Sequence, residues 1–446
     1  MVIKNSIVFF VIVTLSACSA KQTTITVVDE HRVFSETRSP ASVEVNLDAS
    51  ELQAAREGKL GLVYRLGDTD SIIPGQLDSS DPDHPKMVMM LPEENNGAYE
   101  FGLHKQADTF GSMVNATVDP NGQILFEEDG KKVLQYNYHT VYEKDVIRLP
   151  GSETQKPSIS RLGGVYLSEF LKENPRLPKD SAYTNLIYAV PRNDYVHPLY
   201  GLEGEMLTKD WPADGEFHHR GIFWAWPEVE MGAERGDIYA LQRIFARPTE
   251  KVELVSGPVF AQVTAENLWK WGDSIPMVNE YVVIRAYRQT GSTRIIDFNI
   301  RLTALKDSIT IATRLANSYG GFCVRMQTPQ QQQISFYTDT AENKVRAWSD
   351  LSGIFQGNQS RSGLMILQHK DNPEYPGAWA HYDNLSWVQP TFPTPDTRYA
   401  LKKGEPLVLR YRLVIHSNVA QDKDLAVKRW DAYNYTLTPL YHFKSN

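Results

Sequence analysis

The feature that most constrains the fold of this chain is the alternation of apolar and polar residues with a period of two. In "RIIDFNIRLTAL", the apolar side chains of Ile296, Phe298, Ile300 and Leu302 alternate with polar ones. The segment "PLVLRYRLVIHS", residues 406–417, repeats this pattern. Because successive side chains of a strand point to opposite faces, the alternation predicts antiparallel strands with one buried face.

Helical patterns are rare. Two helices are expected, one at "DASELQAAR", where Asp48 can cap the first turn, and one at "DKDLAVKRWDAYN", residues 422–434. The strands are too numerous for one small sandwich. We therefore predict an all-β protein in which residues 126–446 form a large antiparallel β-sandwich, a supersandwich like that of mutarotases, and residues 18–125 form a small N-terminal β domain.

The first residues predict export. Lys4 precedes the apolar run "SIVFFVIVTL", which is too short to span a bilayer comfortably, so residues 1–17 are expected to be a signal peptide. "LSAC", residues 15–18, resembles a bacterial lipobox, which implies that Cys18 carries a lipid after cleavage. We expect a periplasmic or cell-surface lipoprotein, held in the outer membrane by this anchor, because no acidic residue follows Cys18 directly.

Composition narrows the choice of partners. The formal net charge is −8 and no run of basic residues occurs, which argues against nucleic-acid binding. The chain has 2 cysteines, so a lipidated Cys18 would leave only Cys323 and no internal disulfide. Stability must then come from burial of apolar side chains.

Groups able to do chemistry are concentrated in "DWPADGEFHHRGIFWAW", residues 210–226. Prolines and glycines in and before this run indicate an irregular path rather than a strand. The adjacent His218 and His219 cannot point the same way in an extended chain, so we expect one to face a cleft and the other to bond the scaffold. We take these two histidines, with Tyr195 and His197 upstream, as candidate catalytic residues.

Three other segments carry similar groups: "YNYHTVY" at 136–142, "SYGGFCVRM" at 318–326 and "LQHKDNPEYPGAWAHY" at 367–382. An alternative reading is structural, since buried histidines and aromatic residues most often serve packing and an arginine can simply pair with an acid. The candidate substrate-binding residues from all segments are Arg220, Arg325, Trp226, His369, Asn372 and Trp379.

Three of these blocks, residues 195–226, 319–325 and 369–380, resemble a bacterial family of unknown function. That family is often labelled "methane oxygenase PmoA-like" and is found among polysaccharide-degradation genes. A membrane-embedded methane enzyme needs several spanning helices, which this sequence does not predict, so the oxygenase label is rejected. The blocks also resemble the ulvan oligosaccharide dehydratases. The resemblance, from about residue 133 to 418, implies a carbohydrate-active protein and leaves the role of the N-terminal domain open.

Such a dehydratase would be a carbon–oxygen lyase that removes water across C4 and C5 of a non-reducing-end uronic acid. The reaction needs a cation for the carboxylate, a base for the C5 proton and an acid for the leaving hydroxyl. The candidates are, in that order, Arg220 or Arg325, His218 or His219, and Tyr195 or His197, while Trp226 and Trp379 could pack against the sugar ring.

Other functions remain open at this stage. A glycoside hydrolase would use two carboxylates, from Asp210, Asp214, Glu216 and Asp371. A mutarotase-type enzyme would use a histidine and a carboxylate. A divalent metal could bind His197, His218, His219 and His369, but no HExxH-like spacing occurs, so no cofactor is predicted. A glycan-binding surface lipoprotein is the non-enzymatic alternative.

Overall fold

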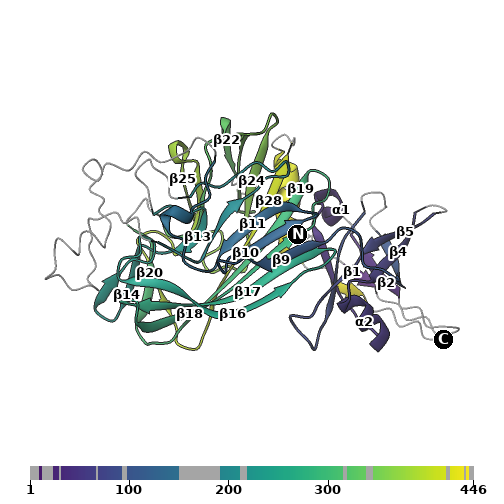
Figure 1. Cartoon of the computed structure of the whole chain (residues 1–446), viewed down its shortest axis with the longest axis horizontal. Helices are drawn as coiled ribbons and strands as arrows, with labels where there is room; N and C mark the ends of the chain where they lie inside the picture. The colour runs from purple at the N-terminus through teal and green to yellow at the C-terminus, as the bar shows by residue number, and fades with distance from the viewer. Residues whose placement is uncertain are drawn as a thin grey trace, which may run out of the picture.

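The structure, a computed structural model, describes residues 10–12, 24–29, 32–66, 69–92, 98–149, 191–210, 218–314, 319–337, 345–417, 422–435 and 438–440. Within these residues, strands dominate and two large antiparallel sheets form the body of the molecule (Figure 1). The all-β sandwich predicted from the alternating pattern is thus confirmed.

The first large sheet, sheet I, contains eight described strands. Their order is β25 (Ala378–Tyr382), β26 (Trp387–Thr391), β21 (Gly321–Arg325), β13 (Ile222–Ala225), β12 (Tyr195–Leu199), β11 (Lys131–Asn137), β10 (Ile124–Glu128) and β9 (Val114–Val118). Because β9 and β10 pair in series with β11, sheet I begins before the domain boundary expected near residue 125.

The second large sheet, sheet II, contains the longest strands. Its order is β16 (Ile244–Val255), β17 (Phe260–Trp271), β18 (Ile275–Tyr287), β19 (Thr293–Ala304), β28 (Leu407–Ser417), β24 (Ser362–Gln368), β23 (Trp348–Ile354) and β22 (Gln330–Phe336). The two alternating segments quoted above are β19 and β28, which pair with each other. Phe298 and Leu409 are 1% exposed, so the apolar face of each strand is buried as predicted.

Sheets I and II pack face to face through large aromatic side chains. Trp224 of β13 lies edge-on to Phe298 of β19, with ring centroids 6.2 Å apart. Phe322 of β21 stacks on Tyr411 of β28 at 4.4 Å. A smaller sheet, in the order β15 (Glu234–Gly236), β14 (Glu228–Met231), β20 (Ile309–Ala312) and β27 (Arg398–Leu401), extends the sandwich at one end.

The N-terminal unit has its own hydrophobic core. One of its sheets has the order β29 (Thr438–Leu440), β1 (Phe10–Ile12), β2 (Thr24–Val28), β8 (Ala98–Lys105), β4 (Leu60–Leu66) and β5 (Thr69–Pro74), and the other has the order β3 (Pro40–Glu44), β7 (Lys86–Met90) and β6 (Gln76–Asp78). The helices α1 (Val33–Thr37) and α2 (Ala49–Arg56) complete it, and the Asp48 side chain caps α2 as predicted.

The N-terminal unit lies at one end of the sandwich and is fixed to sheet II (Figure 1). The Gln76 side chain makes three hydrogen bonds with the main chain of Val259 and Phe260. The C-terminal helix α5 (Lys423–Asn434) returns to this end, where Lys428 pairs with Glu36 of α1. The N-terminal unit, which the family resemblance does not cover, is therefore closely packed against the sandwich.

Candidate functional site

The face of sheet I that points away from sheet II carries a cluster of polar and aromatic side chains. Strand register places Phe223 opposite Cys323, and Arg325 opposite Trp387. Their neighbour Trp224 points the other way, into the sandwich core. The outward-facing side chains are nevertheless buried, because residues 218–219, 239 and 319 lie over them.

His218 and His219 belong to this cluster. The His219 ring lies 4.1 Å from Trp387, and the His218 ring lies 4.5 Å from His219, measured between ring centroids. Tyr239 contacts His218 at 5.6 Å and Tyr319 at 4.7 Å. We call these five residues the imidazole–aromatic cluster. It brings two of the four predicted segments together, the one around residue 218 and the one around residue 325.

Both imidazoles are held neutral. Burial, followed by the guanidinium charges of Arg192, Arg314 and Arg325, lowers the pKa of His218 to about 3. Burial, together with His218, Arg325 and Lys209, holds the pKa of His219 well below its ordinary value. The positive field around His218 disfavours a proton and favours a bound anion.

Two of these guanidiniums are fixed by hydrogen bonds. Arg192 donates to the carbonyl oxygen of Tyr239 at 2.9 Å, and burial lowers its pKa to about 10. Arg314 donates to Asp237 at 2.8 Å and lies 5.9 Å from the ring centre of Tyr319. Burial raises the pKa of Asp237 to about 6 despite Arg314. Such fixed cations can bind an anion with little reorganisation.

Several residues of this site were not predicted from the sequence: Arg192, Arg314, Asp237, Tyr239 and Trp387. Arg314 and Trp387 lie close in sequence to the recognised segments, so their neighbourhood was a weak signal. Asp237 and Tyr239 belong to "RGDIYA", which carries no recognisable motif. Only the packing of that turn against sheet I brings Tyr239 into contact with His218 and Asp237 into contact with Arg314.

Arg220 does not fit its predicted substrate-binding role. Its Nε donates to Asp210, its Nη2 donates to the hydroxyl of Tyr195 at 2.6 Å, and the side chains of Arg220 and Asp210 are each 1% exposed. Tyr195 in turn donates to Asp210 at 2.9 Å, and burial raises the tyrosine pKa well above its ordinary value. These three buried side chains bond one another, and neither Arg220 nor Tyr195 is available to a substrate.

Two other predictions are corrected by burial. His197 is 2% exposed, and its ring nitrogens are bonded to Thr208 at 3.0 Å and to the carbonyl oxygen of Ile147 at 2.8 Å. Trp226 is fully buried, donates to the carbonyl oxygen of Phe392 at 2.6 Å and packs against Trp269. His197 is therefore a structural residue rather than an acid, and Trp226 cannot present its face to a sugar.

The remaining predicted residues lie elsewhere. Asn372 exchanges hydrogen bonds with the main chain of Arg410, at 2.9 and 2.8 Å, and His369 lies beside it near sheet II. Trp379, on the edge strand β25, packs against Phe336. These three residues do not share the imidazole–aromatic cluster, so the expected convergence of all segments on one pocket is not observed.

Tyr136 and Tyr138 of the first segment point into the core, where they bond Asp194 and the main chain of Glu266. Cys18, Asp214 and Glu216 lie outside the described residues, so lipidation and a carboxylate pair at 214–216 stay predictions.

Across the described ranges, we find no group of three histidine, cysteine, aspartate or glutamate side chains that could hold a metal ion. In the same part of the chain, no helix has the length and apolar character needed to cross a bilayer.

A search of curated proteins finds no match to this sequence. A family profile, in contrast, matches residues 180–431, which include both large sheets' central strands and the whole imidazole–aromatic cluster. The chain therefore belongs to the Family of unknown function (DUF6807).

Proposed function

We propose that the protein is a carbohydrate-active lyase that removes water across C4 and C5 of a uronic acid at the non-reducing end of an oligosaccharide of the ulvan type. The observation that supports this most is the neutral imidazole of His218 beside the guanidiniums of Arg192, Arg314 and Arg325. A base next to fixed cations suits a substrate whose acidic C–H bond is adjacent to a carboxylate. The partly exposed ring of Tyr319, at the margin of the cluster, suits the apolar face of a sugar.

In this proposal the uronate carboxylate binds beside Arg314, whose side chain is 38% exposed. The buried guanidiniums of Arg192 and Arg325 add a positive field that stabilises the charge that develops when the C5 proton leaves. His218 takes that proton, and the electron pair of the broken C–H bond forms the C4–C5 double bond. The C4 hydroxyl leaves, and the imidazolium returns the proton to it. The products are the unsaturated uronate and water, and His218 ends as it began.

Substrate binding should also activate the base. A pKa of about 3 makes His218 a weak base in the free protein. A bound carboxylate would neutralise part of the positive field of Arg192, Arg314 and Arg325, which contributes to that low value. The imidazole would then become more basic only when the acidic sugar is in place.

The proposal is tested by following ultraviolet absorbance of the conjugated product during incubation with a panel of uronate-terminated oligosaccharides. His218→Gln should lower kcat by about 10²–10⁴-fold, the usual contribution of a positioned general base. Arg325→Gln should lower kcat/KM by about tenfold to a hundredfold, because it removes part of the fixed positive field that stabilises the developing charge. The matched control is His84→Gln, because His84 lies in the N-terminal unit with its side chain 61% exposed.

Absence of an absorbance rise across the whole panel would reject elimination. So would a His218→Gln protein that turns over at the rate of the His84→Gln control.

A second measurement is the titration of His218 by nuclear magnetic resonance. The free protein should keep this imidazole neutral far below pH 6.5, the ordinary histidine pKa, because burial and the three guanidiniums oppose protonation. Arg325→Gln, or addition of glucuronate, should raise the pKa, since each reduces the positive field. A His218 pKa near 6.5 that responds to neither change would contradict the proposed electrostatics.

The hydrolase alternative receives less support. Asp210, one of its candidate acids, is already bonded to Arg220 and Tyr195. Asp371 lies next to His369 on the sheet II side of the molecule, away from His218.

A further inference from the structure

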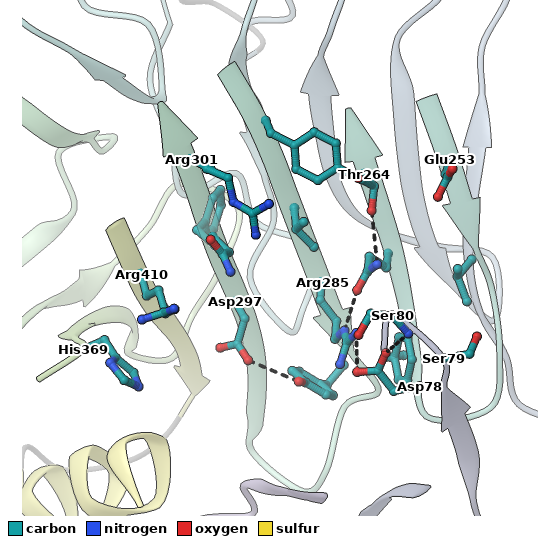
Figure 2. Close-up of a pocket in the computed structure, with 18 of the residues that line it drawn as sticks. Asp78, Ser79, Ser80, Glu253, Thr264, Arg285, Asp297, Arg301, His369 and Arg410 are labelled. Carbon is teal, nitrogen blue, oxygen red and sulfur yellow. Dashed lines mark hydrogen bonds and ion pairs between the residues drawn. The ribbon is translucent and has the colours of Figure 1, made fainter. Parts of the chain in front are cut away.

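A pocket of about 720 Å³ lies on the face of sheet II that points away from sheet I. Its floor is formed by β17, β18, β19 and β28, and the residues Leu77–Ser80 of the N-terminal unit and Tyr433 of α5 form its walls (Figure 2). The volume falls within the range of ligand sites, about 300–1,000 Å³. The sandwich core separates this pocket from His218, so the two sites are distinct.

The floor carries the side chains that a sugar would need. Register aligns Thr264, Val283, Asn299 and Arg410 in one row across the four strands. In the next row, Tyr281 lies opposite Arg301. One face of the sheet thus presents a hydroxyl, an amide, an aromatic ring and two cations to the pocket.

Some of the charges in the pocket are already neutralised. Arg285 pairs with Asp78 at 2.8 Å (Figure 2). Asp297 accepts two hydrogen bonds from Arg412, at 2.6 and 2.8 Å. These ion pairs hold the wall and the floor of the pocket in place, and each pair contributes little net charge to the pocket.

Arg301 and Arg410 are different. Among the described residues, neither guanidinium forms a salt bridge with a carboxylate, and the Arg301 guanidinium lies 5.7 Å from the ring centre of Tyr281. Figure 2 shows both guanidiniums on the same side of the pocket, with the exposed Glu253 on the opposite side. That side of the pocket therefore carries an excess of positive charge.

The pocket is also elongated. A second hollow, of about 250 Å³, shares Leu77, Ser79 and Val255 with it and continues toward α2. A small inorganic anion would fill only a fraction of this space, whereas a chain of sugar rings would follow it.

We propose that this pocket binds an acidic oligosaccharide, with a carboxylate or sulfate group against Arg301 and Arg410 and the sugar rings extending over Tyr281 toward the N-terminal unit. The site does not depend on the proposed elimination at His218. It also gives the N-terminal unit a role, because the segment Leu77–Ser80 forms one wall of the pocket. His369, which lines the same pocket, would contact the ligand here rather than at the imidazole–aromatic cluster.

Isothermal titration calorimetry with the full chain tests the proposal. The probes are a glucuronate-containing tetrasaccharide, its carboxyl-reduced neutral counterpart and inorganic sulfate. The double variant Arg301→Gln/Arg410→Gln should bind the acidic tetrasaccharide at least about tenfold more weakly, since it loses two hydrogen-bond partners that carry charge. Lys306→Gln is the matched control, because it removes one exposed positive charge from a loop outside the pocket.

Hydroxyl-radical footprinting locates the ligand independently of turnover. Tyr281 is 36% exposed and should be protected by the acidic tetrasaccharide. Unchanged affinity in the folded double variant, or no protection of Tyr281, would overturn the proposal. Equal binding of the neutral tetrasaccharide, or sulfate binding as tightly as the acidic tetrasaccharide, would overturn it as well. Because no outcome uses catalysis, a failure here is separate from a failure of elimination.

Discussion

Glu280 and Asp194 form a fully buried acidic pair between the two large sheets. Glu280 accepts a hydrogen bond from Trp269 at 2.7 Å, and Asp194 accepts one from Tyr136 at 2.7 Å. Asn267 donates to Asp194 at 3.0 Å. Burial, and then the neighbouring Asp194, raises the pKa of Glu280 well above its ordinary value, so the pair holds a proton above the pH at which an exposed glutamate loses it.

This pair predicts a pH dependence of stability. The folded protein holds a proton that unfolded Glu280 releases above its ordinary pKa of 4.5, so the free energy of unfolding should fall as pH rises from 4.5 toward the raised pKa of the folded pair. Glu280→Gln mimics the protonated acid and should flatten that dependence. Urea denaturation at several pH values measures it, with the exposed Glu253→Gln as control. If the free energy of unfolding depends on pH equally in Glu280→Gln and Glu253→Gln, the folded protein does not hold a proton on the buried acidic pair.

For single residues, the sequence indicates which segments are rich in functional groups but not the role of each side chain. Arg220 and Trp226 stand in the same crowded segment as His218, yet one is neutralised by Asp210 and the other is packed against Trp269. Burial and pairing are set by contacts between distant segments. A single sequence does not reveal such contacts.

Secondary structure was far more predictable. Strands β19 and β28 coincide with the two alternating segments because each has one face toward the core and one outward. The outward face of β19 is polar, and the same alternation supplies Asn299 and Arg301 to the pocket on sheet II. That this face would form a pocket could not be foreseen, since the walls come from the N-terminal unit and α5.

The second glycine of the Gly320–Gly321 pair, which begins β21, is required by close packing against β26 and the residue after it. Gly321 has φ +113, and a Cβ there would lie 3.0 Å from the backbone of both Pro390 and Phe392. Gly321→Ala should therefore destabilise the protein by more than the roughly 1–3 kcal/mol expected for backbone strain alone. Gly357→Ala is the control, because Gly357 has φ +90 with nothing within 4 Å. Equal losses of stability for Gly321→Ala and Gly357→Ala in denaturant melts would show that β26 can shift without a free-energy cost.

For the molecule as a whole, the junction between the N-terminal unit and sheet II should determine whether the two unfold together. Gln76 is 5% exposed and satisfies three main-chain groups of Val259 and Phe260. Gln76→Ala should cost about 1–3 kcal/mol because buried groups lose their partners, and it should separate the single melting transition into two. Differential scanning calorimetry measures this, with the exposed Gln53→Ala as control. A single melting transition in Gln76→Ala would mean that other contacts are enough to make the N-terminal unit and the sandwich unfold together.

Helix α5 has a consequence for biosynthesis. Ala432 belongs to the hydrophobic core of the N-terminal unit, while Trp430 packs beside sheet II and donates to the carbonyl oxygen of Gln368. The core of the N-terminal unit therefore includes a helix that is translated after all the described strands of sheets I and II. Until residues 422–435 have been synthesised, apolar surface of the N-terminal unit stays exposed to solvent. We therefore expect a chaperone that binds this surface during synthesis to reduce aggregation of the protein.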